Sequence, residues 1–467
     1  MKKKNERGIL RQKDIFLGMI CAMFFLDTVG PVASMGASSI TWSVIISLIF
    51  LFPSGLIMAE MGSSYPADGG MYAWVKKAYG PKWGARMSWL YWINNAIWTP
   101  STCIFTISVF CQVFLGEVPF LYQLLMSIAL IWCIILFSLR SRRTVTRFTN
   151  LAAFFKIFIA AAMVLMAILF LLQGNAPANN ISLQSFRPQL NDTFLFLSAL
   201  IYNYLGFEVM FSVGSQIKNP TTSVPRATIA NTFMISTLYI FVLLAIIIIV
   251  PQKDTSIVDT IMNCFLFANL SPAIEKGVVL IIGSIFLAIL FAQEVTWMIG
   301  AGRLAAGAAK DHELPMAFGK QGKSRDIPVG ALIMTGIVGT VTALIYGLIA
   351  HNTEDLFWTL FSFTNIIFLL PYIINFQAYI KLRKINGKIP GAYHIWGPTF
   401  VGTILARLEQ GILIATIGII LLTPGRGLEL TTILPLLGGT MIVLIIGEIL
   451  INRCHLKYFK QSTTTTE

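Results

Sequence analysis

Apolar stretches recur along the whole chain, and short polar breaks separate them. A helix of about 20 apolar residues crosses the hydrocarbon core of a bilayer, so the pattern predicts membrane-spanning helices. We expect an all-α integral membrane protein with twelve of them, a basic arm at 1–14 and a tail at 453–467. The helices are expected at 15–37, 40–61, 86–115, 120–139, 148–172, 192–217, 227–250, 274–302, 328–350, 355–380, 408–423 and 431–452. The stretch from Pro398 to Ala406 is either the start of the eleventh helix or a loop.

Two of these segments are interrupted. The first carries Gly30 and Pro31 within FFLDTVGPVASMGASSI, and the sixth carries Gly206 in the run LGFE. Pro31 either only kinks its helix, or the two segments are a matched pair of broken helices. Such a pair at corresponding positions of two halves is typical of transporters built as inverted repeats. We therefore expect a five-plus-five inverted repeat, about 15–172 and 192–380, with two further helices at about 408–452.

Composition and charge narrow the class of protein. Only 12% of the 467 residues are charged, whereas a soluble domain usually has about 25%. The mean hydropathy is +0.75. With the N-terminus in the cytoplasm, 29 of the 34 Lys and Arg residues fall on the inner side. By the positive-inside rule the net charge of +13 therefore indicates topology, with both termini cytoplasmic, and not a nucleic-acid partner.

Enzyme and metal signatures are missing from the sequence. The six cysteines lie mostly in apolar segments without metal-ligand spacing, and the chain has only four histidines. It has no phosphate-cradling glycine loop either. We expect no catalytic residues, no metal and no cofactor.

A broken helix offers unpaired backbone groups at its break. The N–H end can hold a carboxylate, and the C=O end can hold an ammonium group. We expect these backbone groups to bind the two ends of a small substrate such as an amino acid. The residues expected to do so are Val29, Gly30, Pro31, Val32 and Ala33 in the first segment, and Leu205, Gly206 and Phe207 in the sixth.

Ionisable residues at membrane depth are candidate functional groups, because the bilayer penalises them. Glu208 either bonds a neighbouring helix or couples gate closure to substrate. Asp27 is either a contact for a substrate amine or a polar tether, and Glu294 either faces the cavity or makes a polar helix contact. Lys156 either snorkels to the cytoplasm or places its ammonium where a sodium ion would otherwise bridge the first and eighth segments.

Most of the many aromatic side chains must face lipid or the core. Five lie at depths where a ring could cover a substrate: Trp98, Tyr202, Phe207, Trp297 and Trp358. We expect Asn95 or Trp98, together with Tyr202 and Trp297, to line the pocket for the substrate side chain.

Four blocks resemble the amino acid–polyamine–organocation superfamily. They are AEMGSSYPADGGMYAWVKKAYG at 59–80, LGFE followed by KNPTTSVPRA, GAGRLAAGAAKDHELP at 300–315, and the interrupted first helix. The resemblance implies the fold of the sodium-coupled leucine transporter and transport of amino acids or amines. Glu208 and Tyr202 match residues of proton-sensitive arginine–agmatine exchangers, and Trp297 matches their gating tryptophan. Lys156 matches the lysine of sodium-independent members, whereas Val29–Ala33 is similar to the looser break of the glutamate–aminobutyrate branch.

We therefore expect a secondary transporter of the cell membrane that moves amino acids, or an amino acid against its decarboxylated amine, without sodium. Its partners are a small-molecule substrate and the lipid bilayer, and a homodimer is left open. Two rival functions remain, a proton-coupled amine or polyamine importer and a transporter-like nutrient sensor.

Overall fold

The computed structural model describes residues 10–188, 196–255, 259–268, 271–322, 327–350, 352–387, 389–390, 392–421 and 430–464. Apart from two isolated β-bridges, the regular structure of these residues is helical. Residues 1–9 of the expected basic arm and 465–467 of the expected tail lie outside the described residues.

Ten helices in the described part of the chain are long and apolar enough to cross a membrane. One is composed of α3 (Ser38–Ile46), the π-helix η1 (Ser47–Leu51) and α4 (Phe52–Ser64), and another of α6 (Pro81–Phe110) and η2 (Cys111–Leu115). The other eight are α7 (Phe120–Ser138), α8 (Arg142–Leu172), α10 (Pro220–Ile249), α12 (Pro272–Lys310), α13 (Val329–Gly347), α14 (Thr353–Asn386), α15 (Thr399–Ile420) and α16 (Leu430–Thr464). Three short helices connect them, α5 (Met71–Tyr79), η6 (Gln252–Asp254) and α11 (Thr260–Leu266).

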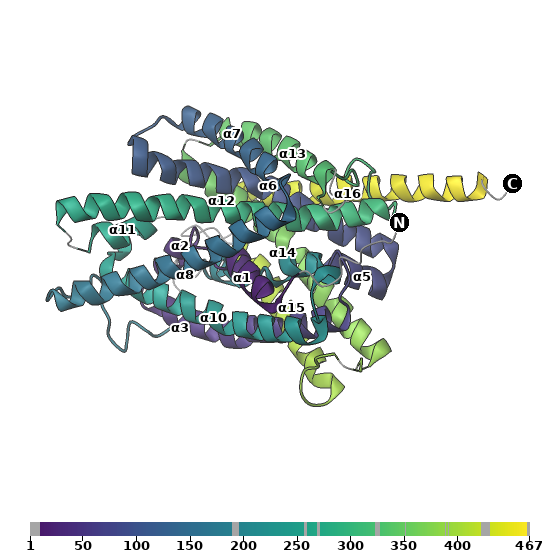
Figure 1. The fold of residues 1–467 in the computed structure, drawn as a ribbon, viewed down its shortest axis with the longest axis horizontal. Coiled ribbons are helices and arrows are strands. Elements are labelled where there is room, and N and C mark those ends of the chain that lie inside the picture. Colours follow the sequence, from purple (N-terminus) through teal and green to yellow (C-terminus); the bar gives the residue numbers. More distant parts are fainter. Residues whose placement is uncertain are drawn as a thin grey trace.

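The structure defines the limits of the last two long helices near the C-terminus. Pro398 is the N-cap of α15, so Pro398 to Ala406 is the start of the eleventh segment and not a loop. α16 continues as a helix to Thr464, so the expected tail at 453–467 begins as a helical extension of the last segment. Figure 1 shows α16 extending past the other helices at its C-terminal end.

The first segment is broken, but one turn earlier than expected. α1 (Gln12–Met23) ends before an unwound stretch, Phe24–Thr28, and α2 (Val29–Ala33) follows. Pro31 stands third in α2, within the first turn, where its missing N–H is not needed. The expected break at Gly30–Pro31 is therefore wrong in position, since this proline begins a helix instead of interrupting one.

The sixth segment breaks at the expected glycine. α9 (Leu197–Asn203) ends before Tyr204–Gly206, and two 3-10 helices follow, η4 (Phe207–Ser212) and η5 (Gly214–Gln216). Gly206 has φ +124°, a backbone conformation that side chains with a Cβ rarely adopt. A Cβ at this position would also lie 3.2 Å from the Trp297 ring. The break at Gly206 is thus confirmed, and its cause is backbone geometry.

The two broken segments lie side by side in opposite directions. α1 contacts η4, and α2 contacts α9, so each first half lies beside the second half of the other segment. Figure 1 shows α1 and α2 in the middle of the bundle, between α12 on one side and α8 and α10 on the other, which agrees with the contacts of α1. The two breaks therefore meet inside the protein.

Candidate functional site

The end of α1 explains where the first break falls. The last carbonyls of a helix have no partner within it. Here three neighbouring helices supply the donors. Lys156 on α8 binds the carbonyls of Cys21 (2.7 Å) and Phe24 (2.5 Å), while Trp297 Nε1 on α12 binds that of Ala22 (3.0 Å). The Tyr239 hydroxyl on α10 donates to the carbonyl of Met23 (3.0 Å). These tertiary hydrogen bonds stabilise the unwound stretch.

Lys156 is fully buried and does not snorkel. Its third hydrogen bond goes to Gln293 Oε1 on α12 at 2.6 Å, which uses all three donors of the ammonium group. The ammonium thus joins α1, α8 and α12 at the negative, C-terminal end of α1. That is the bridging position between the first and eighth segments that was one of the two expected alternatives.

Asp27 lies in the unwound stretch of the first segment and is fully buried. Neither of its carboxylate oxygens has a hydrogen-bond partner among the described residues. Its neighbour Thr28 instead donates to Asn203 Oδ1 at 2.5 Å, at the end of α9, and Asn203 Nδ2 is likewise unpartnered within the described chain. Burying an unpaired carboxylate is costly, so this site favours a ligand that supplies donors.

Glu208 begins the second half of the sixth segment and is also buried. Its Oε1 accepts a hydrogen bond from the Tyr91 hydroxyl on α6 at 2.6 Å, whereas Oε2 has no partner among the described residues. Glu208 therefore contacts a neighbouring helix and still has an oxygen available. The structure brings an under-satisfied acid to each of the two breaks.

Glu294 has a different environment. Both of its oxygens accept hydrogen bonds from α6, one from Thr99 and one from Thr102, each at 2.8 Å. A buried acid with both oxygens paired holds two helices together. Of the two expected alternatives for Glu294, the structure shows the polar contact between helices.

Aromatic rings fill the space between the breaks. The Tyr202 ring centroid lies 5.2 Å from that of Phe25 and 5.9 Å from that of Trp98. Trp297 is 6.0 Å from Phe25 and 6.2 Å from Tyr91, with which it stacks. We call Phe25, Tyr91, Trp98, Tyr202 and Trp297 the aromatic cluster. Three of the expected pocket residues, Trp98, Tyr202 and Trp297, are thus brought together.

Other expected residues do not join this cluster. The Phe207 ring is turned toward α4, with its tip 3.5 Å from the position of a Cβ at Gly55. Trp358 packs at the end of α14 against Phe196 at 5.5 Å. Asn95 is buried on α6 one turn before Trp98, and its Oδ1 has no partner among the described residues. The remaining expected binding residues are buried as well, namely Val29, Gly30, Pro31, Val32 and Ala33 of α2 and Leu205.

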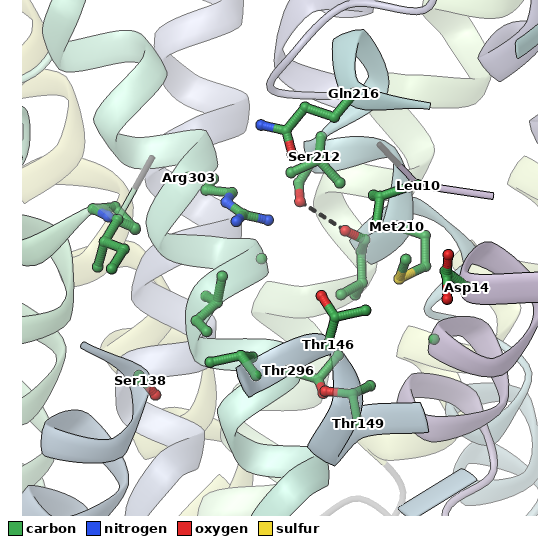
Figure 2. Close-up of a pocket in the computed structure, with 18 of the residues that line it drawn as sticks. Leu10, Asp14, Ser138, Thr146, Thr149, Met210, Ser212, Gln216, Thr296 and Arg303 are labelled. Atoms are coloured by element: carbon green, nitrogen blue, oxygen red, sulfur yellow. Dashed lines mark hydrogen bonds between the residues drawn. The ribbon is translucent and has the colours of Figure 1, made fainter. Parts of the chain in front are cut away.

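A cavity opens on one side of the breaks. Its volume is about 80 Å³, and it lies among α1, α8, α12 and the second half of the sixth segment. Figure 2 shows Arg303, Gln216 and Ser212 on one side of it and Thr146, Thr149 and Thr296 on the other. The Thr296 hydroxyl is 3.7 Å from Cys21 Sγ, so the cavity reaches the end of α1.

An ion-pair network lies on the same side as this cavity, outside the long apolar helices. Lys76 on α5 pairs with Asp311 (2.6 Å) and Glu313 (2.5 Å), which follow α12, and the Tyr72 hydroxyl donates to Asp311 (2.7 Å) and lies 2.9 Å from Glu313. Burial alone would raise the pKa of Asp311, but its hydrogen bonds with Lys76 and Tyr72 outweigh this effect and hold the pKa of this carboxyl below its usual range. The network therefore ties α5 to the end of α12 as charged groups.

Sequence reasoning missed several of these residues. Tyr91, Asn203 and Gln293 were each visible as polar groups within apolar runs, but hydropathy does not say which helix they face. Phe25 had no such signal. Among the described residues no group of three or more His, Cys, Asp or Glu side chains could hold a metal ion.

Comparison with known proteins gives consistent matches over most of the chain. The family model described as amino acid permease matches residues 15–447. A probable agmatine/putrescine antiporter of Lactococcus lactis subsp. lactis is 31% identical over 440 residues, covering 94% of this chain and 93% of the relative. An uncharacterised transporter of Legionella pneumophila is 26% identical over 86% of this chain and 87% of its own. Solute carrier family 7 member 12 of Mus musculus is 23% identical over 86% of this chain and 85% of its own.

Proposed function

The chain belongs to the amino acid permease family, and from that premise we propose that it exchanges an amino acid or an amine for a related amine without sodium. The resemblance to the amino acid–polyamine–organocation superfamily is confirmed, and the protein is a multi-pass membrane transporter and not an enzyme. The direction and coupling of transport are part of the proposal.

The observation that carries the proposal is the pair of acids at the two breaks. Asp27 has two unpartnered oxygens and Glu208 has one, within the described residues. The buried ammonium of Lys156 acts on Asp27 through its charge but gives neither acid a hydrogen bond, because its three bonds go to Cys21, Phe24 and Gln293. A substrate that carries amino groups would supply the missing donors.

The neighbouring groups support a cationic ligand. The faces of Tyr202, Trp98 and Trp297 can attract an ammonium or guanidinium group. Pro31 removes one N–H from the first turn of α2, the end that would otherwise bind a carboxylate. Since a similar protein is a probable agmatine/putrescine antiporter, we propose agmatine and putrescine as the first substrates to test.

Lys156 supports independence from sodium. Its ammonium lies between carbonyls of α1 and a side-chain oxygen of α12, where a cation is needed to satisfy them. A fixed positive charge at this point removes the need for a bound sodium ion. Substrate would leave toward the cavity at Thr149 and Thr296 when the helices on that side separate.

The topology belongs to the same proposal. Twelve spans arise if the broken first and sixth segments each cross the membrane, and the antiparallel contacts of α1 with η4 and of α2 with α9 support an inverted repeat. The repeats are about 15–172 and 192–380, within one domain at 15–452. The distribution of basic residues supports cytoplasmic termini in the cell membrane. In a homodimer each chain would carry its own copy of the proposed site.

One rival function has an observation in its favour. Glu208 Oε2 has no hydrogen-bond partner among the described residues and could bind a proton together with the substrate, which would make the protein a proton-coupled importer. A proton-coupled importer accumulates substrate in empty vesicles when a proton gradient is applied, whereas an exchanger requires a substrate inside the vesicles.

The test is uptake of labelled agmatine or putrescine into proteoliposomes. We expect uptake when the vesicles contain unlabelled amine, no uptake into empty vesicles, and the same rate when sodium is replaced by choline. Uptake into empty vesicles under a proton gradient would favour the importer. Absence of uptake for every amine and amino acid offered would refute the proposal.

Two variants sharpen this test. Asp27→Asn keeps the size of the side chain but removes the charge-assisted bond, about 2 kcal/mol, so we expect KM to rise about 30-fold. Glu275→Gln, at a half-buried acid in the first turn of α12, is the matched control and should leave KM unchanged. An unchanged KM for Asp27→Asn would exclude Asp27 as the amine contact.

A further inference from the structure

Tyr239 on α10 holds the first break. Its hydroxyl accepts a hydrogen bond from the backbone N–H of Phe25 at 2.7 Å and donates to the carbonyl of Met23 at 3.0 Å. Its ring meets Phe24 edge-on at 5.0 Å. Tyr239 is buried and therefore contacts three consecutive residues, the last of α1 and the first two of the unwound stretch.

Tyr204 is the first residue of the second break, and it is also fully buried. Its hydroxyl accepts a hydrogen bond from Ser47 at 3.0 Å and donates to the carbonyl of Ser43 at 3.2 Å. Ser47 begins η1, the π-helical turn that interrupts the α-helical geometry of that span. Such turns occur often at functional sites, and this one gives the second break a fixed partner.

α10 connects these two contacts. Ser236, one turn before Tyr239 on the same face of α10, donates to Ser47 Oγ at 2.8 Å. The hydroxyls of Ser236, Ser47 and Tyr204 thus form a directed chain that ends on the carbonyl of Ser43. The rings of Tyr204 and Tyr239 also meet edge-on at 5.5 Å. Hydrogen bonds in such a chain strengthen one another, and a buried member left unpaired is costly.

We propose that Tyr204 and Tyr239 are positioning residues that couple the two helix breaks through α10. Neither hydroxyl is needed to touch the substrate. When one break changes its backbone, the hydroxyl chain and the edge-on ring contact transmit the change to the other break. The two halves of the substrate site therefore open and close together, a step of the exchange proposed above, on which the transport measurement below rests.

The first experiment measures backbone hydrogen exchange and requires no substrate. Tyr239→Phe keeps the ring and removes the shorter of the two hydrogen bonds of the Phe25 amide, which also donates to the carbonyl of Met23 at 3.1 Å. We therefore expect exchange in residues 23–28 to become about tenfold faster. In the described chain Tyr204 makes no hydrogen bond to residues 23–28. The proposed coupling nevertheless predicts that Tyr204→Phe makes hydrogen exchange in these residues faster. Tyr346→Phe on α13, a helix that packs on α6, α7 and α12, is the control and should change nothing at either break.

The second experiment measures exchange of labelled amine by the two variants and by their combination. If the tyrosines act as one unit, the double variant is no slower than the slower single variant. If each acts separately, the two fold-losses multiply. A normal exchange pattern in residues 23–28 of Tyr204→Phe, or multiplied losses in the double variant, would overturn the coupling.

The two experiments separate this inference from the proposed function. Faster hydrogen exchange at both breaks in a protein that transports no amine would leave the coupling intact and refute the substrate. Normal transport by the wild type with purely local effects of each tyrosine would do the reverse.

Discussion

Replacing Lys156 by methionine removes the ammonium and keeps most of the side-chain volume. Three acceptors then lose their donor, namely the carbonyls of Cys21 and Phe24 and Gln293 Oε1. Each buried acceptor left unpaired costs about 1–3 kcal/mol. The variant also avoids the cost of burying an ammonium ion, which offsets part of this loss. Removing one partner of a buried charged contact destabilises by about 3–5 kcal/mol net. We therefore expect the conformation in which the carbonyls at the end of α1 are hydrogen-bonded to lose about 4 kcal/mol of stability.

The assay is amine exchange in proteoliposomes, with sodium or with choline outside and inside. A penalty of about 4 kcal/mol corresponds to roughly a thousandfold drop in the population of the competent state, so exchange by Lys156→Met should be barely measurable. The smaller Lys156→Ala leaves room for a cation beside the same oxygens, and sodium should restore part of its activity. Lys218→Met, at an exposed lysine after the sixth segment, is the control.

Two results would refute this reasoning. Exchange by Lys156→Met at the wild-type rate would mean that the ammonium does not hold the break. A wild-type protein whose exchange requires sodium would mean that Lys156 does not replace the ion.

Three further predictions concern the supports of the site. Gly206→Ala places a Cβ at φ +124° and 3.2 Å from Trp297, so it should lower the stability by about 1–3 kcal/mol and reduce transport. Gly411→Ala is the control, because its Cβ would meet open space, and it should be tolerated in the same melting and uptake measurements. Glu294→Gln should lower the melting temperature through loss of about 1 kcal/mol and leave the KM for amines unchanged, and a raised KM would contradict its role as a helix contact. Lys76→Met should destabilise by about 0.5–1 kcal/mol at neutral pH. Stabilisation by a carboxylate with a lowered pKa, here Asp311, is lost as pH falls through that pKa, so the difference from wild type should shrink in acid. Melting measured over a series of falling pH values tests this, and a pH-independent difference would refute it.

Hydropathy was sufficient for the long helices, because a span is defined by its own residues. The break at Gly206 could be predicted for the same local reason, since the backbone there needs a glycine. The break of the first segment could not. Its position depends on donors from α8, α10 and α12 that meet the end of α1 only after folding.

Side-chain direction was the second limit of the sequence. Phe207 stands beside Gly206 and was expected to face the substrate, but the tight turns of η4 point it at α4. The aromatic cluster instead includes Phe25, which is placed by the unwound stretch of the first segment. The position of a residue within an apolar segment predicts its depth in the membrane. The direction of its side chain also depends on the path of the backbone.

The three acids show what structure adds to a membrane sequence. Asp27, Glu208 and Glu294 have similar depth in apolar segments, and hydropathy treats them alike. In the described structure they have none, one and two of their oxygens paired by protein. A fully paired acid is part of the scaffold, and changing it should alter stability. An unpaired one has a cost that only a ligand or a proton can relieve, so changing it should alter binding. The count of unpaired oxygens therefore predicts an order of these acids from tether to substrate contact, and the KM values of Asp27→Asn and Glu294→Gln, measured side by side, test that order.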